Sequence, residues 1–233
     1  MAMLEYARGR ISRMTKLILF RLNERSDFLL NRPVYLNDAV EIGGRTGISL
    51  LEFAIEGMEA YHTSLGRYQY PDQYTLADSI VTESSIRRIV TTTALPHVKI
   101  SIKRELLQFY QQAVLPKLCR DGEAPDTYGA TVYLDAQLLE LLNERINVGR
   151  YVAQAKVDTD PEILEVVSDK EALSNKLRDV PQEDRVIQSV LESAEACGVD
   201  KDLAELVFRW VIETTINLEV DYLQATNPTM NPE

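Results

Sequence analysis

The chain has 233 residues, of which 45% are hydrophobic and 26% are charged, and its formal net charge at pH 7 is −11. This composition is typical of a globular protein with a sizeable core and excludes an intrinsically disordered chain. Because contacts to phosphate groups require clustered positive charge, the acidic balance argues against nucleic acid and membranes as partners.

The cysteines and histidines do not form the pattern of a metal centre or a disulfide framework. Cys119 and Cys197 form no Cys-x-x-Cys pair and are accompanied by only two histidines. We therefore expect a reduced, cytoplasmic chain with no metal. The first residues lack the apolar run of a signal peptide, and no stretch has the length of a transmembrane helix. A secreted protein whose signal peptide has been removed is an alternative.

The first half of the chain shows helical periodicity in two places. Apolar residues spaced three and four apart predict a long helix over residues 4–25. After an irregular connection, Ser49 and Glu52 form a capping-box pattern, which predicts a helix from Ser49 to about Arg67. Residues 78–97 are mixed in character, and we expect an extended or short helical connector there.

The second half is more strongly helical. The pattern predicts helices over residues 101–119, with Pro116 near the last turn, and over residues 130–157, where Gly149 is tolerated or serves close packing. Shorter helices are expected to start at Asp160-Pro161, at Ser168 or Asp169, and at Pro181.

Gly198 is expected to end the last of these shorter helices, and a final long helix is predicted over residues 202–226. The expected fold is all-α: a single-domain helical array or bundle over residues 1–226, with long central and C-terminal helices and a frayed tail over residues 227–233.

The central stretch Asn143–Lys156 carries the clearest chemical signal. Arg145 and Lys156 are eleven positions apart, which is close to three helical turns, so both cations project from nearly the same side of a continuous helix. Apolar residues lie between them, which favours an inward orientation. The spacing alone therefore indicates a helical protein with an interior site for an anion, although ordinary surface charge explains the pair equally well.

Other polar residues occupy helical positions that should be buried. Arg8 is one of these, and a single helical arginine is more often solvated. Asp179 and Glu183 are four positions apart at a helix start, where acids usually complement the helix dipole. Thr215 and Glu219, also four apart, lie among apolar neighbours, so Glu219 needs a partner or a proton.

Four stretches resemble the all-helical chorismate mutases of fungi and plants. They are Ile18–Phe28, Phe53–His62, Asn143–Lys156 and Leu218–Leu223, in the order found in the family. The central stretch matches the family run Arg-Ile-x-x-Gly-[Lys/Arg]-[Phe/Tyr]-Val-Ala-[Glu/Gln]-Ala-Lys without a gap. The resemblance implies an isomerase that converts chorismate to prephenate by an intramolecular Claisen rearrangement, on the route from the shikimate pathway to Phe and Tyr.

The resemblance also implies a role for each candidate residue. Arg8 and Arg145 match the arginines that hold the two carboxylates of the substrate, and Lys156 matches the lysine that faces the ether oxygen. Glu219 matches the carboxyl on the far side of that oxygen, and Glu183 matches the acid that accepts from the ring hydroxyl. Two further lining residues are Thr215 and Asp179, the latter standing where fungal relatives carry Asn. No cofactor is implied.

Regulation is less clearly implied. Eukaryotic relatives are dimers, often inhibited by Tyr and activated by Trp at a site between subunits. The matching positions here read Gly66-Arg67 and Gly129-Ala130, so one arginine and a serine of the family pattern are missing. We therefore expect a homodimer whose response to Tyr and Trp is weak or absent, with Arg67, Gly129 and Ala130 as the remaining candidates for an effector site.

Two other functions fit parts of the pattern. A non-enzymatic helical adaptor could hold anionic peptides in a groove lined by Arg and Lys, and it would need its cations in an open channel. A mutase secreted by a pathogen would share the catalytic pattern. The acids Glu183 and Glu219 among the cations favour the mutase over the adaptor.

Overall fold

The computed structural model describes residues 2–68, 73–78, 83–86, 95–96 and 98–227. Within these residues the chain forms helices and no strand, apart from an isolated bridge between Ile42 and Arg45. This confirms the predicted all-α class. No helix in the described part is long and apolar enough to cross a membrane.

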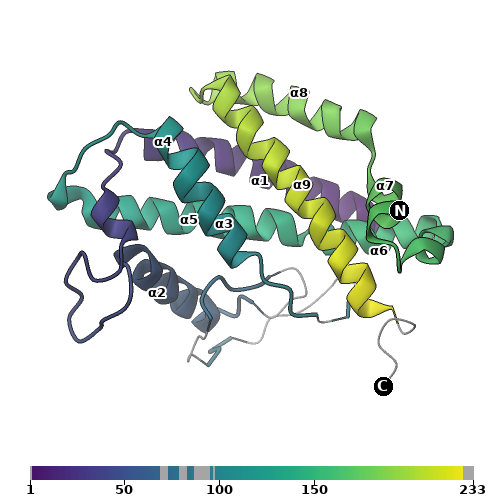
Figure 1. Ribbon diagram of the computed structural model, residues 1–233, viewed down its shortest axis with the longest axis horizontal. Helices are drawn as coiled ribbons and strands as arrows, with labels where there is room; N and C mark the ends of the chain where they lie inside the picture. The colour runs from purple at the N-terminus through teal and green to yellow at the C-terminus, as the bar shows by residue number, and fades with distance from the viewer. Residues whose placement is uncertain (1, 69–72, 79–82, 87–94, 97, 228–233) are drawn as a thin grey trace.

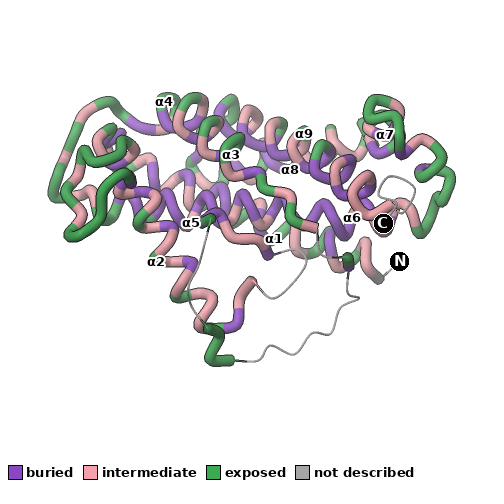
Figure 2. The backbone as a smooth tube through the Cα atoms, turned by 60° about the horizontal axis from the view of Figure 1, so that its bottom comes forward, coloured by how far each residue is buried: buried purple, intermediate pink, exposed green. Residues whose placement is uncertain are grey.

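Three long helices form the framework: α1 (Ala2–Ser26), α5 (Tyr128–Asn147) and α9 (Lys201–Thr226). Helix α1 packs along α5, and α9 crosses α5 (Figure 1). Most residues of α5 are buried, including charged ones (Figure 2). The predicted long central and C-terminal helices are therefore present, and α5 is the most enclosed of them.

The other helices pack against this framework. Helix α2 (Leu50–Ser64) packs on α5, whereas α6 (Gly149–Thr159), α7 (Lys170–Leu177) and α8 (Val180–Ala196) pack on α9. The remaining elements are short: α3 (Lys103–Phe109), a π turn (Tyr110–Val114), α4 (Leu115–Leu118), and 3-10 turns at Arg32–Tyr35, Pro125–Thr127 and Pro161–Val166.

The capping signals predicted from the sequence are present. Ser49 accepts a hydrogen bond from the backbone N–H of Glu52, whose side chain accepts from the Ser49 N–H in return. Helix α2 ends at Ser64, short of the predicted Arg67. The cause is Gly66, whose φ of 82° reverses the chain while the Arg67 N–H donates to the carbonyl of His62.

Two helices predicted as continuous are interrupted. The predicted helix over residues 101–119 contains the π turn Tyr110–Val114, which widens the helix ahead of Pro116, a residue that has no N–H to donate. The predicted helix over residues 130–157 is divided into α5 and α6, with only Val148 between them.

The later boundaries lie close to the predictions. The helix expected after Asp160 is a 3-10 turn, and Asp169 rather than Ser168 caps α7. Gly198, with φ of 73°, follows the end of α8 as expected. Of the expected tail, residues 228–233 lie outside the described residues.

A buried ion pair fixes the end of α1 against α5. The side chains of Arg25 and Asp135 are fully buried, with 2.6 Å between Arg25 Nε and Asp135 Oδ1. The hydroxyls of Tyr35 and Tyr110 also donate to this carboxylate, at 2.7 and 2.6 Å. Burial raises the pKa of Asp135, and its donors oppose that shift. A buried carboxylate must be paired and hydrogen-bonded in this way, so the network holds α1, the π turn and α5 in one arrangement.

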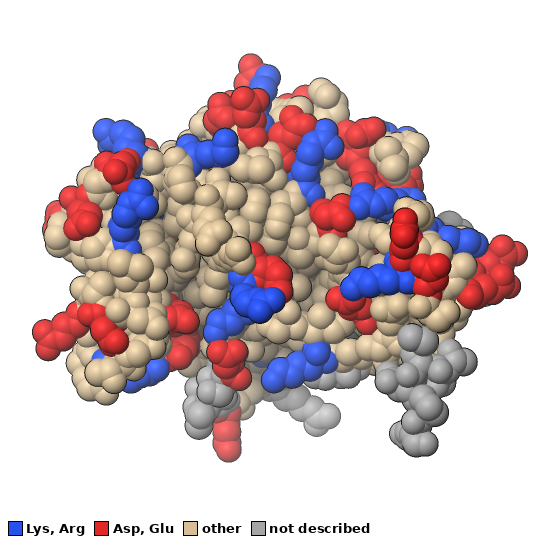
Figure 3. All heavy atoms as spheres, viewed as in Figure 1, with Lys and Arg blue, Asp and Glu red and all other residues tan. Residues whose placement is uncertain are grey.

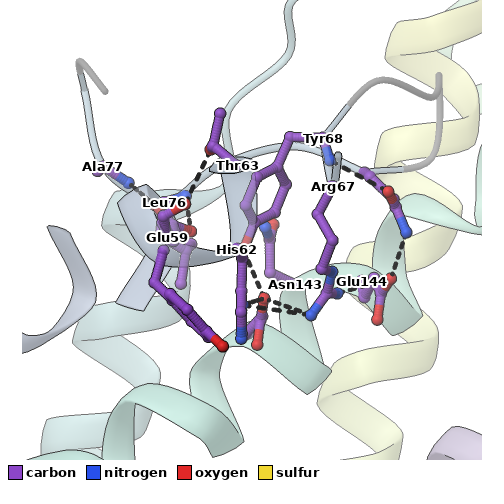
Figure 4. Close-up of polar contacts among 12 residues, drawn as sticks. Glu59, His62, Thr63, Arg67, Tyr68, Leu76, Ala77, Asn143 and Glu144 are labelled. Carbon is purple, nitrogen blue, oxygen red and sulfur yellow. Dashed lines mark hydrogen bonds and ion pairs between the residues drawn. The ribbon is translucent and has the colours of Figure 1, made fainter. Parts of the chain in front are cut away.

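The connector after α2 is tied down by a buried acid. Glu59 is fully buried and accepts hydrogen bonds from the backbone N–H groups of Leu76 and Ala77, at 2.7 and 2.8 Å (Figure 4). Burial raises the pKa of Glu59 to about 7. The sequence did not single out this residue. Residues 89–93 of the expected connector, and His97, lie outside the described residues.

Helix α6 approaches α9 very closely at Gly149. A Cβ atom added to Gly149 would lie 2.7 Å from Cγ2 of Thr215 and 3.4 Å from Cγ of Glu219. The first distance is a steric clash, because Thr215 is buried and its hydroxyl is bound to the carbonyl of Val211. The predicted close packing at Gly149 is therefore confirmed.

We expect Gly149→Ala to lower the free energy of unfolding by about 1–3 kcal/mol, the usual cost of overpacking. In an uncrowded helix the same change stabilises by about 1 kcal/mol. Thr215→Ser removes the clashing methyl group, so in that background Gly149→Ala should be neutral or stabilising. Denaturant unfolding of the four proteins measures this coupling, and equal effects of Gly149→Ala in both backgrounds would contradict the packing argument.

Candidate functional site

A cavity of about 270 Å³ lies where α1, α6, α8 and α9 meet. Its lining includes all seven residues predicted from the sequence: Arg8, Arg145, Lys156, Asp179, Glu183, Thr215 and Glu219. These residues come from distant parts of the chain. The remaining lining is largely apolar, which is typical of a site for a small molecule.

Arg145 is the most unusual group in the cavity. Arg145 is only 4% exposed, and its Nε has no hydrogen-bond partner among the described residues. Burial lowers the pKa of Arg145 to about 10, and the nearby Glu219 partly offsets this. A buried cation with an unused donor is costly unless an anion completes it.

Lys156 and Glu219 form an ion pair on the cavity wall. Lys156 Nζ lies 2.8 Å from Glu219 Oε2 and also donates to the carbonyl of Leu177 at 2.6 Å. Glu219 is only 2% exposed, and burial raises its pKa although Lys156 and Arg145 oppose the shift. The predicted buried carboxyl is therefore present, with Lys156 as its partner.

The start of α8 contributes the two other acids. Asp179 is the N-cap of α8, accepting from the Gln182 N–H at 3.1 Å, and its own N–H donates to Glu183 Oε1 at 3.2 Å. Asp179 and Glu183 are therefore acids at a helix start, as expected, and both also lie on the cavity wall.

Two lining residues have simpler surroundings. Arg8 has an exposed side chain and lines both this cavity and an adjoining groove between α1 and α8. Thr215 is buried and donates its hydroxyl proton to the carbonyl of Val211 at 2.6 Å. The Thr215 oxygen can therefore act toward the cavity only as an acceptor.

One polar lining residue was missed by the sequence interpretation. Gln182 lies on the cavity wall, and Arg185 donates to its amide oxygen from Nε and Nη2, at 3.2 and 2.9 Å. Gln182 lies three positions after the N-cap Asp179, where Glu or Gln commonly completes a capping box. That pattern could have indicated its place next to the two acids.

The three candidates for an effector site are not brought together within one chain. Arg67 binds Glu140 at 2.9 Å and Glu144 at 3.1 Å on α5 (Figure 4). Gly129 and Ala130 lie at the opposite end of α5, about 15 to 20 Å away at 1.5 Å per residue. His62 also contacts Glu140, with 2.8 Å between His62 Nδ1 and Glu140 Oε1.

Charges of both signs lie close together on the surface and in the cavity. Basic side chains lie beside acidic ones across the face shown in Figure 3. In the cavity, Arg8, Arg145 and Lys156 converge with Glu183 and Glu219. The cations therefore line a cavity together with acids, rather than the open channel that the adaptor hypothesis requires.

Comparison with known proteins gives one consistent result. The family model for chorismate mutase type II matches residues 128–220. The chorismate mutase of Schizosaccharomyces pombe is 27% identical over 95% of this chain and 95% of its own length.

Solved structures agree with the sequence matches. The chorismate mutase Aro7p of Candida albicans, in complex with L-Trp, superposes with a TM-score of 0.85 at 25% identity, covering 94% of this chain and 90% of that chain. AtCM1, solved with tyrosine and with phenylalanine in its allosteric site, gives a TM-score of 0.83 at 27% identity, with 94% of each chain covered. Family model, full-length relatives and solved structures therefore agree that the chain is similar in sequence and fold to the all-helical chorismate mutases of the fungal and plant type.

Proposed function

We propose that the cavity is the active site in which this chain, an isomerase, converts chorismate to prephenate on the way to Phe and Tyr. The observation that carries the proposal is the buried Arg145, which lines the cavity with an unused donor. Chorismate is a small dicarboxylic acid, and a bidentate guanidinium–carboxylate pair would satisfy that donor.

The reaction requires little of the protein beyond shape and charge. Within one substrate molecule the ether C–O bond breaks and a C–C bond forms, so no atom enters or leaves. The enolpyruvyl arm must fold over the ring, and the ether oxygen gains negative charge in the transition state. Fixing two carboxylates removes the rotational freedom of the arm, and hydrogen bonds to the oxygen stabilise the growing charge.

The proposed roles follow the positions in the cavity. Arg145 binds one carboxylate from the buried side, and the exposed Arg8 binds the other. Lys156 and a protonated Glu219 donate to the ether oxygen once the substrate replaces their direct contact of 2.8 Å. Glu183 accepts from the ring hydroxyl at the start of α8, where the Asp179 side chain caps the helix. Thr215 completes the wall.

The decisive assay follows chorismate loss by absorbance. We expect Lys156→Ala to lower turnover about a hundredfold or more, because a donor to a developing oxyanion contributes about 3 kcal/mol. Arg145→Ala should lose at least as much, since it removes the bidentate contact. Arg104→Ala is the matched control, because Arg104 is exposed on α3 and, among the described residues, forms an ion pair only with its neighbour Glu105. Wild-type protein without turnover would exclude the proposed function.

Glu219 makes activity depend on pH. Burial raises its pKa, so the protonated, donating form persists above the usual range of a glutamate. Activity should be full below that raised pKa and fall as pH increases through it. Glu219→Gln keeps a donor at every pH, so its pH–activity profile should be flatter than that of the wild type. Identical profiles for the two proteins would remove Glu219 from the mechanism.

We also propose a cytoplasmic homodimer, each copy forming one domain over residues 1–226. Large apolar side chains are exposed on helices that pack together: Leu17 and Phe20 on α1, and Tyr133 on α5. Such side chains are commonly covered by a second subunit. Two free cysteines are consistent with a reducing compartment. Sedimentation should give twice the 26.4 kDa mass of the chain, and a monomer at assay concentration would contradict the dimer.

The response to aromatic amino acids should be weak. Arg67 is held by Glu140 and Glu144, so an effector carboxylate would have to compete with two ion pairs. Related proteins have been solved with Trp, Tyr or Phe bound, which makes the test direct. We expect Trp and Tyr to change activity by much less than tenfold under conditions of subsaturating chorismate. Tenfold activation by Trp would refute this.

A further inference from the structure

An arginine outside the cavity contacts one of the proposed substrate-binding acids. Arg178 lies in the short link between α7 and α8, and its side chain is about one-third exposed. Its Nη1 donates to Glu183 Oε2 at 3.3 Å, and its Nη2 donates to Glu213 on α9. Glu183 lines the cavity, whereas Arg178 and Glu213 do not.

The two oxygens of Glu183 are held by different donors. Oε1 accepts from the backbone N–H of Asp179 at 3.2 Å, and Oε2 accepts from Arg178. Each carboxylate oxygen has two lone pairs, so both oxygens keep the capacity for one more donor. Glu183 is therefore held in one orientation by two donors, while both of its oxygens can accept from a ligand.

Glu213 determines how Arg178 acts. Its carboxylate occupies the second edge of the guanidinium, so most of the charge of Arg178 is neutralised locally and does not compete for the carboxylates of a substrate. Without Arg178, the Glu183 carboxylate would be free to turn toward the cations of the cavity. If Glu183 formed an ion pair with Lys156 or Arg8, neither the acid nor the cation would be available to the substrate.

We propose that Arg178, anchored by Glu213, is a positioning residue that holds Glu183 as the acceptor for the ring hydroxyl of the substrate. This rests on the proposed function, because it assigns Arg178 a part in recognising chorismate by its hydroxyl. Arg178 and its two acids, which we call the clamp, join the start of α8 to α9. The clamp therefore sets the position of Glu183 relative to the Glu219 side of the cavity.

The test is a double-mutant cycle on kcat/KM with chorismate. Arg178→Ala should lower kcat/KM about tenfold, the value of a hydrogen bond to a charged group. In the Glu183→Gln background the same change should have less than a twofold effect, because Arg178 acts through Glu183. Glu213→Gln should give a smaller loss that also disappears in that background. Arg209→Ala is the matched control, an exposed arginine on α9 paired with Glu205 one turn away.

A second readout separates positioning from general damage. With a substrate analogue whose ring lacks the hydroxyl, wild type and Arg178→Ala should react equally well. Equal losses from Arg178→Ala in both backgrounds, or with both substrates, would overturn the proposal. If Arg178→Ala does not fold, the Glu213→Gln cycle decides by the same criterion. The wild type could turn over chorismate and Arg145→Ala could lose that activity, while Arg178 and Glu183 show no coupling. That result would refute this inference alone and leave the proposed function intact.

Discussion

The close approach of α6 to α9 at Gly149 is the constraint on which the site depends. A side chain at this position would overlap Thr215, so the two helices can approach to this distance only around a glycine. The approach brings Thr215 and Glu219 on α9 beside the cavity that Arg145 and Lys156 enter from α5 and α6. With a wider crossing, the 2.8 Å contact between Lys156 and Glu219 would be lost, and the cavity would open to water. The backbone spacing thus determines the electrostatics of the site.

Positive and negative groups are equal in number in the lining of the cavity, although the protein as a whole is acidic. The chain has a net charge of −11, yet the cavity lining combines three cations with Asp179, Glu183 and Glu219. If all six groups are ionised, their charges cancel. Protonation of Glu219, which burial favours, leaves one positive charge for a dianionic ligand. A site of this kind does not need a strongly positive surface, because Arg145 is buried where the local dielectric is low and its attraction for an anion is less screened.

Local patterns in the sequence predicted the framework, and long-range contacts explain what they missed. The capping box at Ser49, the glycine at the end of α8 and the spacing of Arg145 and Lys156 are short-range features, so the sequence contained them directly. The roles of the cavity residues came from the resemblance to a family, since spacing left each charge equally compatible with the surface. The Arg25–Asp135 pair joins residues 110 positions apart, and no local pattern could connect them. The ion pair between Arg178 and Glu213 could not be predicted for the same reason, because the two residues are 35 positions apart.

Arg145 and Arg150 show what the structure adds to the sequence. They lie five positions apart in the same family stretch, and both are buried. Arg150 donates to Asn147 and to the carbonyls of Val98 and Ile100, and it lies over the ring of Tyr74 at 4.0 Å, so its donors serve the fold. Burial lowers the pKa of both arginines, but Arg145 has an Nε that finds no partner among the described residues. A buried guanidinium satisfied by carbonyl groups fixes a connector, whereas one left incomplete in a cavity is positioned for an anion that arrives from outside.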